Sequence, residues 1–176
     1  MTLEYKISQQ DFLDFQLFTA SKSERINKKK KNGWILLTLG SIVIASYFYL
    51  NQNNSMAIYF AMVAIACGLF YPKYFKWRYR KHYKTYIEEN YSKRFDQVEI
   101  LQINDDSIFS KDRTGEGKIN LSEVGKIDET DNHFFLKLSA GLSLIIPKKG
   151  LDNPDELRKK FRALGLTLND ETNWKW

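Results

Sequence analysis

A long stretch without charged residues dominates the hydrophobic pattern of this sequence. The 41 residues 32–72 contain no Asp, Glu, Lys, Arg or His. One apolar run covers residues 33–50, a second covers residues 56–75, and the five residues 51–55 between them are polar but uncharged. A helix of 18 residues is about 27 Å long, close to the roughly 30 Å of a bilayer hydrocarbon core. The pattern predicts two antiparallel transmembrane helices, 33–50 and 56–75, joined by an external turn at 51–55, with a break or kink at Pro72.

Two other interpretations of this stretch fit less well. A cleaved signal peptide has its apolar run near the start of the chain, whereas this run begins at Gly33 behind a polar segment and without an A-x-A cleavage pattern. A buried helical hairpin of a soluble protein is normally amphipathic, and these runs carry no charge on any helix face. Membrane insertion is therefore the favoured interpretation.

Positive charge flanks the apolar stretch on both sides. Residues 1–32 have a net charge of +3, residues 73–84 of +6 and residues 85–176 of −3, which together give the +6 of the chain. Because basic residues stay on the cytoplasmic side and the turn 51–55 has none, both termini are predicted to be cytoplasmic. We expect eleven basic side chains to contact anionic lipid headgroups: Arg25, Lys28, Lys29, Lys30, Lys31, Lys73, Lys76, Arg78, Arg80, Lys81 and Lys84.

Small residues recur at helical spacing within both spans. Because lipid provides no hydrophobic force between helices, small side chains promote packing by letting backbones approach. We expect helix packing at Ser41, Ala45, Ala57, Ala61, Ala64 and Gly68. The short turn favours packing within one hairpin, and contact with a second copy in a homo-oligomer is the alternative. Neither span contains an ionisable residue, which argues against an ion pathway.

Shorter elements are predicted on either side of the hairpin. The cytoplasmic segment 1–32 contains a short strand near Leu3–Ile7, a helix that follows a capping box at Ser8–Asp11, and the basic run. That helix has an apolar face, which either docks on the cytoplasmic domain or lies in the membrane interface. Residues 76–92 continue the second span as a basic juxtamembrane helix. Its aromatic and basic residues also resemble an RNA-binding surface, but the juxtamembrane position favours lipid, so no nucleic-acid partner is predicted.

The remaining segment, 93–176, has the alternating pattern of β-strands. Five or six short strands joined by turns are predicted between residues 98 and 146, and the loop between the second and third lies at 112–117. A helix follows, with Asp152 or Asn153 as N-cap and Pro154 at its first position. The fold class is therefore α+β, with a two-helix transmembrane hairpin and a cytoplasmic antiparallel β domain closed by a C-terminal helix.

Chemistry-bearing motifs are missing from the sequence. One Cys and two His do not form a disulfide framework or a structural zinc site. Gly115 and Gly117 lack the strand, helix and Lys-Ser/Thr of a phosphate-binding loop, and the acidic residues lack a metal-binding spacing. The sequence therefore predicts no catalytic residue, no metal and no cofactor, and the protein is not expected to be an enzyme.

Four segments are similar to a known family. They are Tyr5-Lys6-Ile7-Ser8, Asp11-Phe12-Leu13, the block from Ile127 to Phe134 that contains Glu-Thr-x-x-His, and Ile145-Ile146-Pro147-Lys148-Lys149. With the two adjacent spans, they resemble the YcxB-like family of small bacterial membrane proteins. The resemblance implies a pleckstrin-homology-like β domain, a location in the bacterial plasma (inner) membrane and no established enzymatic activity.

These observations predict a membrane-anchored, non-enzymatic binding or regulatory module at the cytoplasmic face of the plasma membrane. Its expected partners are a bilayer with anionic headgroups and a membrane-localised protein. The alternative is an immunity protein that protects the cell against a membrane-directed toxin. The sequence identifies no binding partner.

Overall fold

The computed structural model describes residues 1–113 and 115–176, so Thr114 of the predicted loop 112–117 lies outside the described residues. The chain forms two compact units. The head unit consists of Met1–Gln16 and Thr85–Lys175, and the hairpin unit consists of Leu17–Lys84 and Trp176. Because the two parts of the head unit flank the hairpin unit in sequence, the hairpin is an insertion into the head.

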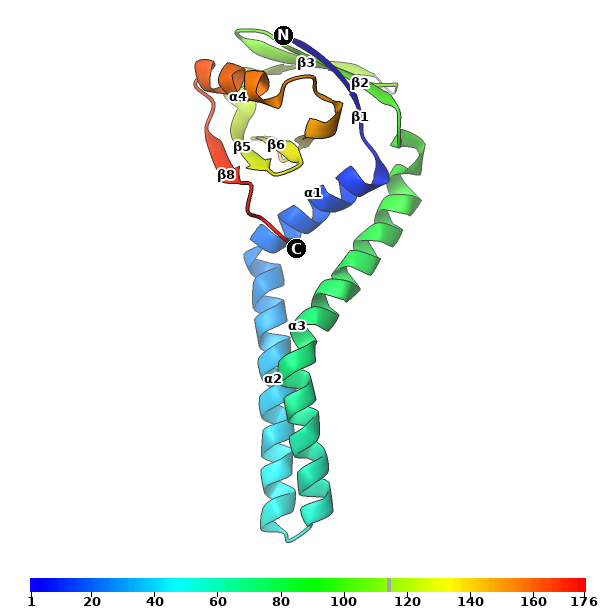
Figure 1. Cartoon of the computed structure of the whole chain (residues 1–176), viewed down its shortest axis with the longest axis vertical. Coiled ribbons are helices and arrows are strands. Elements are labelled where there is room, and N and C mark those ends of the chain that lie inside the picture. The colour runs from blue at the N-terminus through cyan, green and yellow to red at the C-terminus, as the bar shows by residue number, and fades with distance from the viewer. Residues whose placement is uncertain (114) are drawn as a thin grey trace. The chain divides into compact units, whose positions relative to one another are not determined.

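Two long helices, α2 (Glu24–Leu50) and α3 (Asn54–Tyr91), form the hairpin (Figure 1). The predicted spans lie inside them, and the basic segments continue the helices beyond the apolar runs. Both helices begin with a side-chain cap, because the Ser23 hydroxyl accepts from the N–H of Ile26 and the Asn53 amide oxygen accepts from the N–H of Met56. The turn between the helices is accordingly shorter than the predicted 51–55.

Pro72 lies inside α3, which continues through it. Of the predicted break or kink, the break is therefore wrong, because Trp34 on the other helix makes the hydrogen bond that Pro72 cannot make, as described below. The hairpin exposes most of its large apolar side chains, and no residue of α2 is buried. By length and composition, both helices qualify as candidate membrane spans, because each contains an 18-residue apolar window. Exposed apolar surface of this extent fits a membrane protein.

Two four-stranded sheets and a helix form the head. The first sheet has the order β1 (Thr2–Lys6), β2 (Val98–Ile103), β3 (Ser107–Lys111) and β4 (Glu116–Asn120). The second has the order β7 (Ser143–Pro147), β6 (His133–Leu138), β5 (Val124–Thr130) and β8 (Leu168–Glu171). Helix α4 (Pro154–Ala163) begins at an Asn153 cap. The core between them contains Leu101, Ile103, Ile108, Ile127, Phe134, Leu136, Ile146, Leu157 and Phe161. The predicted α+β fold class is confirmed, with one difference: β8 follows α4 and pairs in parallel with β5, so the sheets are not wholly antiparallel and α4 is not the last element.

The N-terminal strand pairs with a strand that follows the hairpin. In the antiparallel β1–β2 ladder, Leu3 lies opposite Leu101, and the amino group of Met1 donates to the carbonyl of Ile103, 102 residues further along. The predicted boundaries had grouped residues 1–32 as one separate segment. The structure instead includes residues 1–16 in the head, because Leu3 and Tyr5 on the inner face of β1 are buried in its core.

Helix α1 (Gln9–Lys22) contributes its first residues to the head. Phe12 and Leu13 are buried, and the Phe12 ring lies 5.1 Å from the ring of Tyr91 and 6.0 Å from that of Phe95. The Phe15 ring meets Phe135 edge-on at 5.3 Å. These contacts favour the docked interpretation of the helix over the one that lies in the membrane interface.

Candidate functional site

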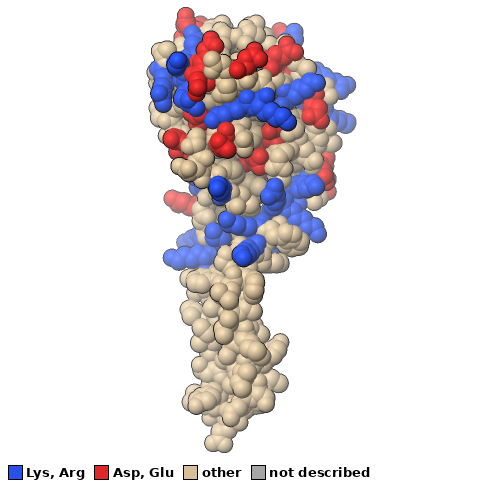
Figure 2. Space-filling view, viewed as in Figure 1, with Lys and Arg blue, Asp and Glu red and all other residues tan. Residues whose placement is uncertain are grey.

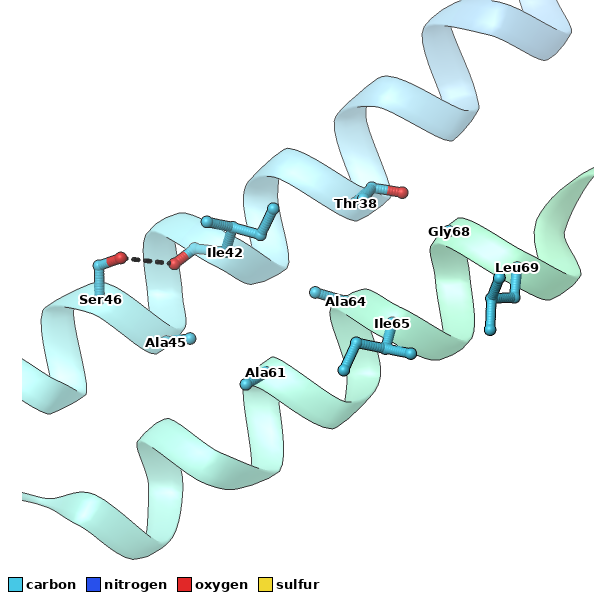
Figure 3. Close-up of a pocket in the computed structure, with 9 residues that line it drawn as sticks. All are labelled: Thr38, Ile42, Ala45, Ser46, Ala61, Ala64, Ile65, Gly68 and Leu69. Atoms are coloured by element: carbon cyan, nitrogen blue, oxygen red, sulfur yellow. Dashed lines mark hydrogen bonds between the residues drawn. The ribbon is translucent and has the colours of Figure 1, made fainter.

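The apolar halves of α2 and α3 pack through small residues. A groove of about 530 Å³ lies between them and is lined by Thr38, Ile42, Ala45, Ser46, Ala61, Ala64, Ile65, Gly68 and Leu69. In Figure 3, Ala45 and Ala64 are turned toward the opposite helix. Of the residues predicted to pack, Ala45, Ala61, Ala64 and Gly68 line this groove, and Ala57 is buried and lines a neighbouring one. Ser41 instead donates to the carbonyl of Leu37 in its own helix.

Pro72 leaves the carbonyl of Gly68 without its usual helical donor, because proline has no N–H. The indole N–H of Trp34, on the other helix, donates to this carbonyl at 3.1 Å. A free carbonyl is costly next to hydrocarbon, and membrane helices tolerate proline where a neighbour supplies the missing hydrogen bond. Trp34 therefore supplies the hydrogen bond that Pro72 cannot make, and this bond links α2 to α3.

One turn away, the helices come into close contact at Gly33 and Tyr71. A Cβ atom at Gly33 would lie 2.2 Å from the Tyr71 hydroxyl oxygen and 3.1 Å from the ring carbon that bears it. Any larger residue at position 33 would therefore require the hydroxyl end of Tyr71 to shift. The pairs Gly33–Tyr71 and Trp34–Gly68 mark the level at which the two helices are held together, and α2 and α3 diverge beyond it toward their basic ends (Figure 1).

The divergence leaves a cavity of about 910 Å³ between the basic ends of the helices. Helix α2 and its cap contribute Ser23, Arg25, Ile26, Lys29 and Leu37, and α3 contributes Tyr71, Tyr74, Phe75, Arg78, Tyr79, His82 and Tyr83. On α3 these residues form two rows at a spacing of four. One row is aromatic and consists of Tyr71, Phe75, Tyr79 and Tyr83; the other consists of Tyr74, Arg78 and His82. The lining carries three permanent positive charges and no carboxylate.

The predicted headgroup residues lie where the uncharged part of the hairpin ends. Figure 2 shows an uncharged lower part of the hairpin with Lys and Arg side chains gathered directly above it. The structure brings Arg25, Lys29 and Arg78 together around the cavity. The other eight do not line it: Lys28, Lys30, Lys31, Lys73, Lys76, Arg80, Lys81 and Lys84. The sequence analysis missed the cavity itself, although the spacing of four between Tyr71, Phe75, Tyr79 and Tyr83 was a readable signal of one aromatic helix face.

In the head, a buried carboxylate joins three elements. Glu129 on β5 is 4% exposed, and it accepts hydrogen bonds from Lys148 at 2.7 Å and from the guanidinium of Arg158 on α4 at 2.6 to 3.2 Å. Burial would raise the pKa of Glu129, but the hydrogen bonds from Arg158 and Lys148 outweigh it and hold the pKa below its usual value. The same pairing raises the pKa of Arg158. Glu129 therefore serves to anchor α4 on the sheet.

The rest of the Glu-Thr-x-x-His block anchors α1. His133 is 4% exposed, and its ring nitrogen Nε2 lies 2.7 Å from Oδ1 of Asp11. Burial would raise the pKa of Asp11, but the hydrogen bonds from His133 and Ser8 lower it overall. The Thr130 hydroxyl accepts from the His133 N–H and closes the β5–β6 turn. These polar residues hold elements together and do not surround a substrate-sized space.

A second cavity, of about 300 Å³, lies within the head. Its wall includes Phe12, Phe15, Tyr91 and the strand β7, and its polar end includes Arg94, Glu99 and Asp112. Arg94 is 2.9 Å from Asp112 and 3.7 Å from Glu99, and burial raises the pKa of Glu99 despite this cation. Since β7 is an edge strand of its sheet, this cavity adjoins unpaired backbone. In the described ranges, no group of three or more His, Cys, Asp or Glu is placed to hold a metal.

Comparison with known proteins identifies a family for part of the head. Residues 103–164 match the family described as YcxB-like protein. The matched segment contains β3 to β7 and α4, and with them Glu129, His133, Lys148 and Arg158. The predicted family resemblance is confirmed over these residues. No curated protein and no solved structure matches the chain, so a pleckstrin-homology-like head stays a prediction.

Proposed function

We propose that this chain, which is similar to the YcxB-like family over residues 103–164, is a membrane-anchored, non-enzymatic binding module of the bacterial plasma membrane. In this proposal the hairpin crosses the bilayer twice, both termini are cytoplasmic, and the head binds a protein partner at the membrane surface. The observation that carries it is the charge-free, outwardly apolar hairpin with basic residues at both ends and none in its turn.

Charge supports the orientation. Eleven Lys and Arg residues flank the hairpin, and the turn 51–55 has none. Each basic residue near an anionic leaflet contributes roughly 1 kcal/mol of attraction. Moving either basic cluster across the bilayer would therefore be strongly unfavourable, and both clusters favour the same, cytoplasmic side.

Strand pairing supports the same topology independently. The strand β1 precedes the hairpin and β2 follows it, yet the two are hydrogen-bonded along five paired residues. Strands in one sheet must share one compartment. The hairpin therefore has to return to the side from which it left, which requires an even number of membrane crossings.

The binding role is supported by the way the head is held. A short anchor confines the head to the membrane surface and raises its effective concentration toward any partner located there. The cavity that adjoins β7 offers aromatic walls, and Leu142 on its rim is 68% exposed. An extended peptide segment of a partner could add to this strand edge.

Cysteine labelling in intact cells tests the topology. In a Cys67→Ala background, Asn53→Cys in the turn should react with a membrane-impermeant maleimide from outside. Lys175→Cys in the head should react only after the membrane is opened. Labelling of Lys175→Cys from outside, or recovery of the chain in the soluble fraction, would refute the membrane topology.

In-cell photo-crosslinking tests the binding role. A photo-reactive residue at Leu142 should give one discrete adduct with a membrane protein, and the same residue at Glu116 on the exposed strand β4 should not. Equal adduct patterns at both positions, or none at Leu142, would argue against a binding site at β7.

A further inference from the structure

The cavity between the basic ends of α2 and α3 spans the boundary between two chemical environments. Leu37 and Tyr71 belong to the charge-free stretch 32–72, whereas Arg25, Lys29 and Arg78 lie outside it. Residues 25 and 37 are separated by 12 positions, which corresponds to about 18 Å along a helix. The cavity is therefore long enough to contact both the polar and the apolar part of one amphiphilic molecule.

The polar part of the cavity selects for negative charge. Arg25 and Lys29 from α2 and Arg78 and His82 from α3 all line it, and all four are exposed. In the part of the chain that the structure describes, none of the three permanent cations is ion-paired with a carboxylate. Three cations that face one space without a counter-charge repel each other, and an anion between them relieves this repulsion.

The apolar part provides a preformed wall. Phe75 is 6% exposed and stacks on Tyr79 at 4.4 Å, and the Tyr71 and Tyr83 rings continue the same row at 6.1 and 6.0 Å from their neighbours. Leu37 and Tyr74, at the rim, are 46% and 49% exposed, so the cavity opens to the surroundings there. An acyl chain lying along this wall could therefore leave the cavity toward the bilayer.

We infer that this cavity binds one anionic glycerophospholipid, with its phosphate between Arg25, Lys29 and Arg78 and its upper acyl chain along Leu37, Tyr71 and Phe75. The inference rests on the proposed membrane topology and makes it more specific. Headgroup contact at the eleven basic residues is a diffuse attraction, whereas this site retains a single lipid by combining charge with a shaped apolar wall. The volume of about 910 Å³ falls in the range of ligand pockets.

Native mass spectrometry of the full chain released from detergent micelles tests the site. Phosphatidylglycerol and phosphatidylcholine with identical acyl chains are titrated separately, and the retained lipids are counted. We expect one phosphatidylglycerol to be retained at concentrations at least tenfold below those needed for phosphatidylcholine. Equal retention of the two lipids would overturn the inference.

Charge variants locate the site. Arg25→Gln/Lys29→Gln/Arg78→Gln removes the three lining cations and should weaken retention of the one lipid on the order of 100-fold. Lys28→Gln/Lys31→Gln/Arg80→Gln removes the same charge from exposed positions outside the lining and should leave that lipid bound within about threefold. An equal loss in both variants would show diffuse attraction only and overturn the inference.

A cavity-filling variant tests the contribution of the space between the helices while the cations are kept. Ile26→Trp keeps every cation but occupies the space between the helices, and it should abolish retention of the lipid. Unchanged retention in Ile26→Trp would overturn the inference even if the charge variant does not fold.

Two competitors identify the source of the anion. Glycerol 3-phosphate at millimolar concentration should not displace the lipid, because it lacks the acyl chains. A short polyglutamate peptide should not displace it either, and displacement by either compound would assign the cavity to a soluble anion or an acidic protein and overturn the inference. The cysteine labelling above measures topology alone, so a failed lipid site with correct labelling leaves the proposed function intact.

Discussion

Replacing Trp34 by Phe tests whether the hairpin depends on the hydrogen bond to Gly68. The substitution keeps an aromatic ring but removes the indole N–H that lies 3.1 Å from the Gly68 carbonyl. Because Pro72 offers no N–H, that carbonyl then loses its donor. Hydrogen bonds between membrane helices contribute about 0.6 kcal/mol on average and about 1.7 kcal/mol at most. A carbonyl without an alternative donor belongs at the upper end, so we expect Trp34→Phe to destabilise the helix pair by about 1 to 1.5 kcal/mol.

A second substitution isolates the hydrogen bond. In Pro72→Ala the residue at position 72 regains an N–H, which can donate to Gly68 within α3. Trp34→Phe should then cost about 0.5 kcal/mol or less, the part due to lost ring contacts. The cost of Trp34→Phe with Pro72 in place, minus its cost in the Pro72→Ala variant, is the coupling energy. Lost ring contacts contribute equally to both costs and cancel in this difference.

The assay is a titration of the full chain with sodium dodecyl sulfate in mixed micelles. Fluorescence energy transfer between dyes at Lys28→Cys and Arg80→Cys, in a Cys67→Ala background, reports whether the helix ends stay together. Trp77→Phe is the matched control, since within the described residues its indole N–H donates to no protein group. If Trp34→Phe cost the same with Pro72 in place as in the Pro72→Ala variant, the reasoning would be refuted.

Three further predictions concern packing and the head. Gly33→Ala should weaken the hairpin by about 1 to 3 kcal/mol in the same titration, and Tyr71→Phe should recover most of this loss, because the new Cβ would lie 2.2 Å from the Tyr71 hydroxyl oxygen. Glu129→Gln should destabilise the head by about 2 kcal/mol in urea unfolding at pH 7, since it leaves Arg158 without its buried partner. The folded-state pKa of Glu129 is lowered from 4.5, so its contribution is complete above about pH 5 and is lost as the pH falls through the folded value; a wild-type head that gains stability on acidification relative to Glu129→Gln would contradict this. Asn153→Ala should cost about 1 kcal/mol in urea unfolding, because the caps on the first turn of α4 disappear, and an unchanged midpoint would contradict it.

Much of the fold could be predicted because its signals are local in sequence. The hairpin follows from composition alone, since a stretch of this length without charge has few alternatives to the bilayer. The start of α4 follows from Asn153 and Pro154, whose cap and fixed backbone angle act within one turn. The alternating burial along β1 and the second half of β2 matches the alternation of apolar and polar residues there, whereas at the start of β2 Val98 is exposed and Glu99 is buried.

Other features depend on contacts that no local pattern encodes. The strand β8 has the sequence Leu-Asn-Asp-Glu, with three polar residues, and it is a strand through its parallel pairing with β5, where Asn169 also donates to the buried Asp128. The partner of β1 lies beyond the hairpin, so its sheet position could not be predicted from residues 1–32. The cavity at the basic ends depends on where the helices meet and diverge, which the pairs Gly33–Tyr71 and Trp34–Gly68 determine together.

The same long-range pairing gives the Glu-Thr-x-x-His block its physical meaning. The block is part of the family resemblance, and in the structure two of its residues hold elements of the head together. Glu129 holds α4 through Arg158, and His133 holds α1 through Asp11, which lies 122 residues earlier in the chain. Under the proposed membrane topology, β1 and α1 are made before the bilayer is crossed and the strands that they join are made afterwards, so the contact between Asp11 and His133 links the two parts. The Asp11–His133 pair therefore joins the two parts of the head that the hairpin separates in sequence, whereas Glu129 joins elements that all follow the hairpin.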